Sequence, residues 1–450
     1  MLQQVVSRSQ PQLHRILGMR DLIFLVVGTV IGSGIFLVPG TVLRSVGNSV
    51  SLATLVWLAG GLLSLLGALT YGELTALKPQ AGGLYVFIRD CFGPLPAFLF
   101  GWTLFFVIST GSIATLVVAF GNYLTEFVPL NTFATKLVSV LVILISCTVN
   151  VRGTRGSADL QNIATTLKVV AIAVMAAALL YFGKQFSFGS SEPSQIAGSS
   201  LASGFGVAMI AVLWAYEGWQ YVTYSAGETV DPQRTFPRAF LIGSAILMGL
   251  YVSSSLGYIA ALGPRSVAAS NRVAATAVSA IVGPVAAKIV AAAILISMFS
   301  AAHSIVLTAP RVYYAMAKDG LFFERLAHVH PRFGTPALAI VAGSIWSAVL
   351  ALTGTFEQLL TYVVFIGWIF YALAAASVFA YRRRQPDLIR PYRVPGYPVT
   401  PLLFILAAAV LVANTIITQP ARSALGLGIV LVGLPAYFLW SRNRKERYEG

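Results

Sequence analysis

Apolar residues along this chain gather in long segments, and polar residues are largely confined to the short stretches between them. We expect twelve membrane-spanning helices, because most segments approach the roughly 20 residues that a helix needs to cross the apolar core of a bilayer. The predicted spans cover residues 22–43, 50–76, 95–121, 134–151, 159–182, 203–226, 238–262, 285–316, 336–353, 358–381, 402–418 and 424–440. The pattern predicts an all-α polytopic membrane protein.

Two of these apolar segments are interrupted in the middle. Gly32, Ser33 and Gly34 interrupt the first segment, and a polar, Gly-containing stretch at residues 214–219 interrupts the sixth. Gly disfavours a helix by about 1 kcal/mol relative to Ala, and open backbone inside a bilayer is tolerated only where protein or water satisfies it. Two interrupted segments at corresponding positions are typical of the binding site of a secondary transporter.

The alternative explanation of the first interruption is close helix packing. Gly28 and Gly32 are four residues apart, which is the spacing of small residues at contacts between membrane helices. The second interruption favours the binding site over packing alone, and we expect the two breaks to face each other.

Composition and charge agree with a membrane protein. The chain is 57% hydrophobic and 10% charged, whereas soluble domains carry about 25% charged residues. The net charge of +15 does not indicate nucleic-acid binding, since the basic residues lie in the short loops. Of the 30 Lys and Arg residues, 21 fall on one predicted side and 7 on the other. This bias places both termini in the cytoplasm.

Several charged residues lie within or at the ends of predicted spans, and two of them, Lys168 and Glu73, suggest distinct roles. Lys168 follows Asp159 by nine residues, or roughly 14 Å at 1.5 Å per residue, so it falls near the midplane. A charge there costs about 2.5–3.5 kcal/mol, and we expect a functional role rather than a lysine that reaches an interface. Glu73, at a cytoplasmic end, is expected to pair with a loop arginine rather than carry protons.

The breaks predict a particular ligand chemistry. A broken helix exposes N–H groups that attract a carboxylate and C=O groups that attract an ammonium, so a site with both suits an α-amino acid. We expect Gly32, Ser33 and Gly34 to hold the carboxylate. The ammonium would lie on carbonyls near Trp214, Ala215 and Glu217, with the pocket walled or capped by Trp214, Tyr216 and Trp219.

Several motifs carry a resemblance to a known family. They are Gly-Ser-Gly-Ile-Phe at 32–36, Ala-Gly-Gly-Leu-Tyr at 81–85, Ala-Tyr-Glu-Gly-Trp at 215–219, Gly-Glu at 227–228 and Pro-Gln-Arg-Thr-Phe-Pro-Arg at 232–238. Together they resemble the amino acid–polyamine–organocation transporters over nearly the whole chain. The branch that the motifs most resemble is that of the L-type amino acid transporters and their bacterial relatives.

The resemblance implies a LeuT-like fold that works by alternating access. It implies a cytoplasmic tail at 1–21, inverted repeats at 22–182 and 203–381, added spans at 402–440 and a second cytoplasmic tail at 441–450. By motif position, substrate would bind at Val30, Gly32, Ser33, Gly34, Trp214, Ala215, Tyr216, Glu217 and Gly218. Lys168 would replace the sodium ion of coupled relatives, with Ser297 or Ser300 as its partner, and His303 and Trp219 would contribute to coupling or gating.

Some positions depart from relatives and leave alternatives open. Glu217 could attract a cationic side chain, shuttle a proton, or hydrogen-bond to neighbouring backbone. His303 stands where some L-type members have Asn, and we expect a neutral hydrogen-bonding role over a titrating one. The external loop 122–133 lacks cysteine, so no disulfide-linked heavy subunit is expected through it.

The sequence therefore predicts a sodium-independent transporter of neutral L-amino acids, either an exchanger or a proton-coupled symporter, in a bacterial cell membrane. A carrier of polyamines or cationic amino acids is the alternative within the family, and an amino acid sensor is the alternative outside it. We expect no enzyme and no cofactor, since the chain lacks an apparent nucleophile–base pair, metal-ligand spacing or phosphate loop. Cys91 and Cys147 give neither a disulfide framework nor a metal site.

Overall fold

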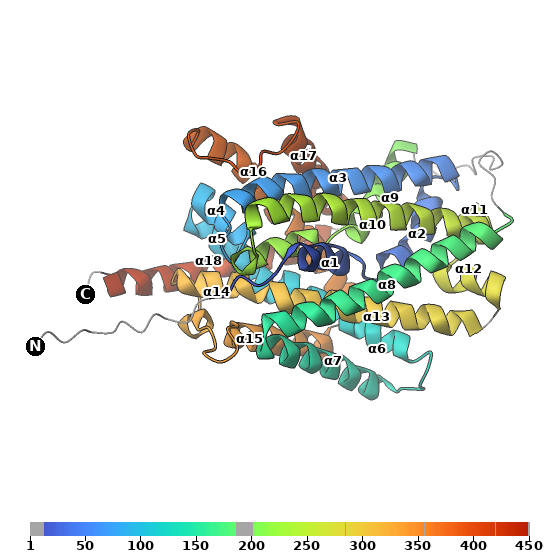
Figure 1. Ribbon diagram of the computed structural model, residues 1–450, viewed down its shortest axis with the longest axis horizontal. Helices are drawn as coiled ribbons and strands as arrows, with labels where there is room; N and C mark the ends of the chain where they lie inside the picture. The colour runs from blue at the N-terminus through green and yellow to red at the C-terminus, as the bar shows by residue number, and fades with distance from the viewer. Residues whose placement is uncertain (1–12, 186–200, 284, 355, 419, 449–450) are drawn as a thin grey trace, which may run out of the picture.

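The computed structural model describes residues 13–185, 201–283, 285–354, 356–418 and 420–448, and this part of the chain is helical without a single named strand. Most of the predicted N-terminal tail, the linker residues 186–200 and the last two residues of the C-terminal tail lie outside it. The helices run along the long axis of the molecule (Figure 1). The predicted all-α class is confirmed.

Eight helical runs in the described chain are long and apolar enough to cross a membrane, and a bent pair of shorter helices makes a ninth. The bent pair is α1 (Met19–Val30) with α2 (Gly34–Ser45). The eight are α3 (Val50–Leu77), α5 (Pro94–Thr103) with η1 (Leu104–Ile108) and α6 (Ser109–Leu124), α7 (Thr132–Arg152), α8 (Thr154–Phe182), α10 (Pro232–Leu262), α13 (Val285–Thr308) with α14 (Pro310–Lys318), α17 (Val399–Thr418) and α18 (Pro420–Tyr448).

The three remaining predicted spans are also helical. They are α9 (Leu201–Ala215) followed by the 3₁₀ helix η2 (Trp219–Glu228), then α15 (Ala337–Thr353) and α16 (Phe356–Arg384). With 15 and 17 residues, α9 and α15 fall below the usual length of a span. The count of twelve spans therefore stays a prediction. Short helices complete the described chain: α4 (Leu84–Phe92), α11 (Pro264–Ala269), α12 (Val273–Val282) and η3 (Glu324–Ala327).

Both predicted interruptions are present in the backbone. Residues 31–33 separate α1 from α2, and the two helices meet at a bend of 50°. Residues 216–218 separate α9 from η2, and Gly218 has a φ of +129°, which L side chains rarely adopt. The helix α2 packs against α9, while α1 packs against α8, α10 and α13.

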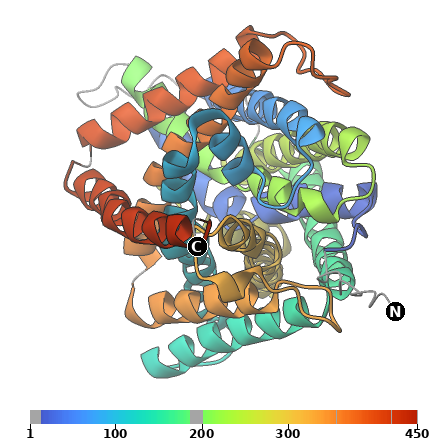
Figure 2. The same ribbon diagram turned by 90° about the vertical axis from the view of Figure 1, so that its left-hand side faces the viewer.

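Burial differs strongly between the helices, so the bundle has inner and outer members (Figure 2). In the most apolar part of the α5–α6 run 72% of positions are buried, and in the α13–α14 run 67%; the figure is 22% for α7 and 17% for α18. The inner helix α13 packs against α1 and η2 of the broken segments, and α6 packs against α13. The last two spans, α17 and α18, are also little buried, with 28% and 17% of positions buried in their most apolar parts.

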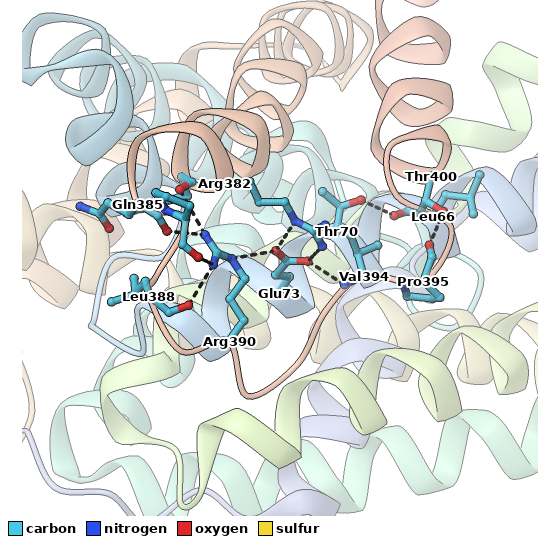
Figure 3. Close-up of polar contacts among 12 residues, drawn as sticks. Leu66, Thr70, Glu73, Arg382, Gln385, Leu388, Arg390, Val394, Pro395 and Thr400 are labelled. Carbon is cyan, nitrogen blue, oxygen red and sulfur yellow. Dashed lines mark hydrogen bonds and ion pairs between the residues drawn. The ribbon is translucent and has the colours of Figure 1, made fainter.

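The predicted ion pair of Glu73 is confirmed at one end of the bundle (Figure 3). The buried carboxylate accepts hydrogen bonds from Nε and Nη2 of Arg382 at 2.9 and 2.7 Å, and from the backbone N–H of Val394 at 2.6 Å. Arg390 Nε lies 3.8 Å away. Glu73 thus ties α3 to α16 and to residues 385–398, the segment that leads into α17.

Candidate functional site

A cavity of about 90 Å³ lies between the two breaks. Its lining comes from α1, α2, α6, α9, η2, α13 and the residues of both breaks. The lining residues are Thr29, Val30, Gly32, Ser33, Gly34, Ser112, Thr115, Leu116, Trp214, Ala215, Glu217, Gly218, Tyr221, Ala301 and Ile305. Eight of the nine residues predicted to bind substrate are among them, and Tyr216 is the exception.

The two breaks touch each other through glycine. A Cβ atom on Gly34 would lie 2.8 Å from the Cβ of Ala215, and one on Gly218 would lie 2.9 Å from the carbonyl oxygen of Thr29. Real Cβ atoms do not come this close, so both positions require glycine. Gly32 has more space, since its nearest neighbour would be Leu116 at 3.6 Å.

Gly28 has a packing role instead. A Cβ there would collide with the side chains of Gln161 and Thr165 on α8, at 2.1 and 2.4 Å. The helix-packing interpretation is therefore right for Gly28, and the close approach of the two breaks explains Gly34 and Gly218.

The start of α2 presents N–H groups to the cavity. Because the helix begins at Gly34, its first N–H groups have no acceptor in a preceding turn. Ser33 is the N-cap residue, and its side chain makes no capping hydrogen bond. The positive end of the helix dipole adds to these donors, which makes the position suited to a carboxylate.

The end of α1 is occupied by a lysine from α8. The buried Lys168 donates from Nζ to the carbonyl oxygens of Gly28 at 2.5 Å and Ile31 at 2.8 Å. Ser297 on α13 donates to the carbonyl oxygens of Ile31 and Gly32 at 2.8 and 2.9 Å. A positive charge at a helix C-terminus is favourable. Lys168 and Ser297 therefore share the carbonyl oxygen of Ile31 at the first break.

Tyr251 on α10 joins the two breaks, and no pattern in the sequence marked it as part of the site. Its hydroxyl lies 3.3 Å from the carbonyl oxygen of Val30 and 3.2 Å from that of Ala215. These are two of the carbonyls expected to hold an ammonium group. Each carbonyl has two lone pairs, so a ligand would share them with Tyr251.

Ser300 and His303 lie away from this arrangement. Ser300 accepts a hydrogen bond from Gln161 on α8 at 3.0 Å. The ring of His303 lies with Nε2 3.2 Å from the carbonyl oxygen of Ser157 and with Nδ1 3.3 Å from the amide nitrogen of Asn150. A carbonyl only accepts and an amide nitrogen only donates, so this geometry assigns a neutral ring with its proton on Nε2.

Two predicted wall residues point elsewhere. The ring of Tyr216 packs against Trp57 and Tyr251, with centroids 6.0 and 4.9 Å apart. Trp219 packs against Tyr71, Phe240 and Phe404. Neither lines the cavity. Tyr216 lies in the break itself, and Trp219 begins the 3₁₀ helix that follows Gly218.

Glu217 lines the cavity and has two partners. Its Oε1 accepts from the hydroxyl of Tyr371 at 3.1 Å and from the side-chain amide of Gln220 at 3.5 Å. A carboxylate has about four lone-pair sites, so acceptor capacity remains on the cavity side.

Sequence reasoning missed the part of the lining that lies outside the two breaks, including Thr29 on α1. Ser112, Thr115 and Leu116 lie on one face of α6, Ala301 and Ile305 on one face of α13, and Tyr221 on η2. Hydroxyl side chains inside an apolar span could have indicated this lining, but many spans carry such side chains. Only the placement of the helices in the structure shows which of them face the cavity.

A buried ion pair joins η2, the helix that follows the second break, to α14. Arg311 on α14 and Glu228 at the end of η2 are 0% and 1% exposed, and Arg311 Nη2 lies 2.9 Å from Glu228 Oε1. Thr154 at the start of α8 donates to the same carboxylate at 2.7 Å. The backbone of Leu17 pairs with Glu228 and Val230, so the segment before α1 joins this junction.

These features define a helical multi-pass membrane protein with a small cavity between two broken helices. The chain matches the family model for amino acid permeases over residues 17–434. It is 32% identical to the serine/threonine exchanger SteT of Bacillus subtilis, over 95% of this chain and 97% of the relative. It is 31% identical to the human large neutral amino acids transporter small subunit 2 (94% and 80%) and 30% identical to the human cystine/glutamate transporter (96% and 87%).

The chain belongs to the amino acid permease family. Its relatives are transporters and exchangers of amino acids and not enzymes. The predicted family is therefore confirmed, and amino acid transport is the activity that the family supports.

Proposed function

We propose that this permease transports small neutral L-amino acids by alternating access and without sodium. The fold would be the LeuT-like arrangement of two five-helix inverted repeats plus two added spans, with both termini in the cytoplasm of a bacterial cell. The observation that carries the proposal is the contact of Lys168 and Ser297 with the carbonyls of the first break.

The substrate would lie along the two breaks. Its carboxylate would meet the N–H groups at Ser33 and Gly34 and the Ser33 hydroxyl. Its ammonium would meet carbonyls at Val30, Trp214, Ala215 and Glu217, two of which also contact Tyr251. The side chain would then point toward α6 and η2. The cavity of about 90 Å³ is far below the roughly 300–1,000 Å³ of pockets for drug-sized ligands, which favours small amino acids.

Sodium independence follows from charge. A sodium ion between α1, α8 and α13 would need carbonyl and hydroxyl oxygens, and Lys168 already donates to those of Gly28 and Ile31. A second cation beside a buried ammonium would be repelled strongly in this low-dielectric setting. Lys168 as a fixed charge supports obligatory exchange, and Lys168 that loses its proton in the cycle supports proton symport. The exchanger named among the relatives favours exchange.

Uptake into proteoliposomes tests the proposal. Labelled L-amino acids would be offered to vesicles that are empty, preloaded with the same amino acid, or under an inward proton gradient, each with sodium or with choline. We expect uptake that is independent of sodium and stimulated by preloading. Strict sodium dependence, or no uptake of any neutral amino acid, would overturn the proposal. Binding without uptake would favour the sensor.

A carrier of cationic amino acids or polyamines is the second candidate, because Glu217 places a carboxylate on the cavity. The test is competition of lysine and putrescine with neutral amino acids in the wild type and in Glu217→Gln. If the cations compete in the wild type and lose this ability in the variant, the second candidate replaces the first.

A disulfide-linked heavy subunit is not part of the proposal. The loop 122–133 lacks cysteine, and we expect the chain to work alone in the vesicles. Activity that appears only with an added partner would contradict this expectation.

A further inference from the structure

One wall of the cavity, formed by α6 and η2, carries two buried hydroxyl groups that lack partners in the described chain. Thr115 is 5% exposed and Tyr221 is 3% exposed, and both line the cavity. The Oγ1 atom of Thr115 and the hydroxyl oxygen of Tyr221 are buried and make no hydrogen bond within the residues that the structure describes. Buried polar groups are almost always paired, so this wall is incomplete as it stands.

Neighbouring hydroxyls in the same lining are satisfied by the protein. Thr29 donates to the carbonyl oxygen of Leu25 at 2.7 Å and contacts the hydroxyl of Ser304. Ser112 donates to the carbonyl oxygen of Ile108 at 2.6 Å. The helix backbone pairs the hydroxyls of Thr29 and Ser112. The hydroxyls of Thr115 and Tyr221, the second of which lies near Ser112, line the cavity without such a hydrogen bond.

A third polar group completes the wall. Glu217 also lines the cavity, and its Oε1 accepts hydrogen bonds from Tyr371 and Gln220. Its carboxylate can only accept, whereas the hydroxyls of Thr115 and Tyr221 can donate as well as accept. The wall therefore offers acceptor and donor together, beside the apolar side chain of Leu116.

We propose that this wall is the subsite for the substrate side chain and that it selects a short side chain with a hydroxyl group, as in serine and threonine. The inference rests on the proposed function of amino acid transport. A substrate hydroxyl would donate to Glu217 and accept from Tyr221 or Thr115, so that one group satisfies both kinds of partner. The methyl group of threonine would lie against Leu116.

The same wall rejects apolar amino acids of equal size. Valine has the shape of threonine but carries a methyl group in place of the hydroxyl. Its binding would leave the hydroxyls of Thr115 and Tyr221 unpaired and away from water and would bring a methyl group instead of a donor to Glu217. A site built to hydrogen-bond a hydroxyl discriminates strongly against an analogue that lacks it. The small volume of the cavity works against aromatic and long cationic side chains.

The test compares threonine with valine, and serine with 2-aminobutyrate, in exchange assays with purified protein in proteoliposomes. We expect the wild type to show a KM for valine at least tenfold above that for threonine. Thr115→Val and Tyr221→Phe should each narrow the valine-to-threonine ratio at least threefold, mainly by raising the KM for threonine.

Two matched substitutions on the outside of the bundle serve as controls. Thr148 on α7 is exposed, with its hydroxyl on the carbonyl oxygen of Leu144, and Tyr181 on α8 is 82% exposed. Thr148→Val and Tyr181→Phe remove the same atoms away from the cavity and should keep the wild-type ratio.

Equal KM values for threonine and valine in the wild type would overturn the inference while leaving amino acid transport intact. A wild-type ratio that survives in both Thr115→Val and Tyr221→Phe would also overturn it, provided that both proteins are folded by their melting curves. Absence of transport for every amino acid would instead overturn the proposed function. The wild-type comparison needs no variant, so a misfolded mutant does not remove the test.

Discussion

Two side chains at the first break donate hydrogen bonds to backbone carbonyl groups that the bilayer cannot satisfy. The Nζ atom of Lys168 and the hydroxyl of Ser297 together cover the carbonyl oxygens of residues 28, 31 and 32. Depth in the fifth predicted span was enough to single out the lysine. Its acceptors became visible only once α8 was placed against α1.

Lys168→Met tests this role. The change leaves buried carbonyls without a donor, which costs about 1–3 kcal/mol for each unpaired group, and it removes the charge at the end of α1. We expect at least a tenfold lower exchange rate per folded protein. Lys136→Met is the control, because Lys136 donates to the carbonyl of Leu352 in an exposed position. Wild-type exchange by Lys168→Met would show that the charge is dispensable.

Tyr251→Phe tests the contact between the two breaks. Removing the hydroxyl frees the carbonyls of Val30 and Ala215 and should cost about 1 kcal/mol of stability, seen as a lower melting temperature in detergent. We also expect a changed KM, since the same carbonyls face the ligand.

Tyr258→Phe is the matched control for that change. It lies on the same helix, equally buried, and its hydroxyl reaches only the sulfur of Met175 at 4.0 Å. If the two variants behave alike, the contact of Tyr251 with the breaks has no special role.

Whether a site residue could be predicted from the sequence depended on whether its residue type conflicts with a regular helix. Glycine and serine inside an apolar segment marked Gly32, Ser33, Gly34 and Gly218 because such residues conflict with a helix. Thr115, Tyr221 and Tyr251 stand in regular helical sequence, where nothing distinguishes a side chain that faces a cavity from one that faces a neighbour. Tyr216 and Trp219 pack against other rings and do not line the cavity, because the sequence does not give the direction of side chains in and after a break.

Elements were predicted well where the apolar pattern was long. Each of the predicted spans coincides with helix, and both breaks fall where the glycine-containing stretches indicated. The short helices α11 and α12 were not predicted. They are Ala-rich pieces between Gly263 and Gly283, and they are held by tertiary contacts, among them those of Arg44 with the carbonyl of Ala268 and of Arg272 with Glu126.

Gly218→Ala tests the contact between the elements. The positive φ and the 2.9 Å approach to the carbonyl oxygen of Thr29 leave no place for a methyl group. We expect the breaks to separate and transport to fall more than tenfold. Gly249→Ala on α10 is the control, because a Cβ there meets nothing within 4 Å. Full activity of Gly218→Ala, measured as initial exchange rate, would contradict the close contact.

At the scale of the whole molecule, the buried pair of Glu228 and Arg311 joins η2 to α14, and Thr154 adds α8. Removing one partner of a buried ion pair costs about 3–5 kcal/mol, whereas removing both costs less. We therefore expect Arg311→Met to yield little folded protein.

The double variant Glu228→Gln with Arg311→Met distinguishes the pair from its separate members. It should recover much of the folded yield, as judged by size-exclusion profiles and melting temperature. Equal loss in the single and double variants would show that the two charges do not act as a pair.

The carboxylate of Glu73 has a consequence for biosynthesis. Its partner Arg382 stands 309 residues later in the chain, and at about 5–20 residues per second the ribosome needs roughly 15–60 s to supply it. During that time α3 has left the translocation machinery, and the carboxylate of Glu73 lacks the arginine that pairs with it in the folded protein. A nascent chain that stops before residue 382 never receives that cation. The tie between α3 and the segment before α17 can therefore form only after synthesis has passed α16.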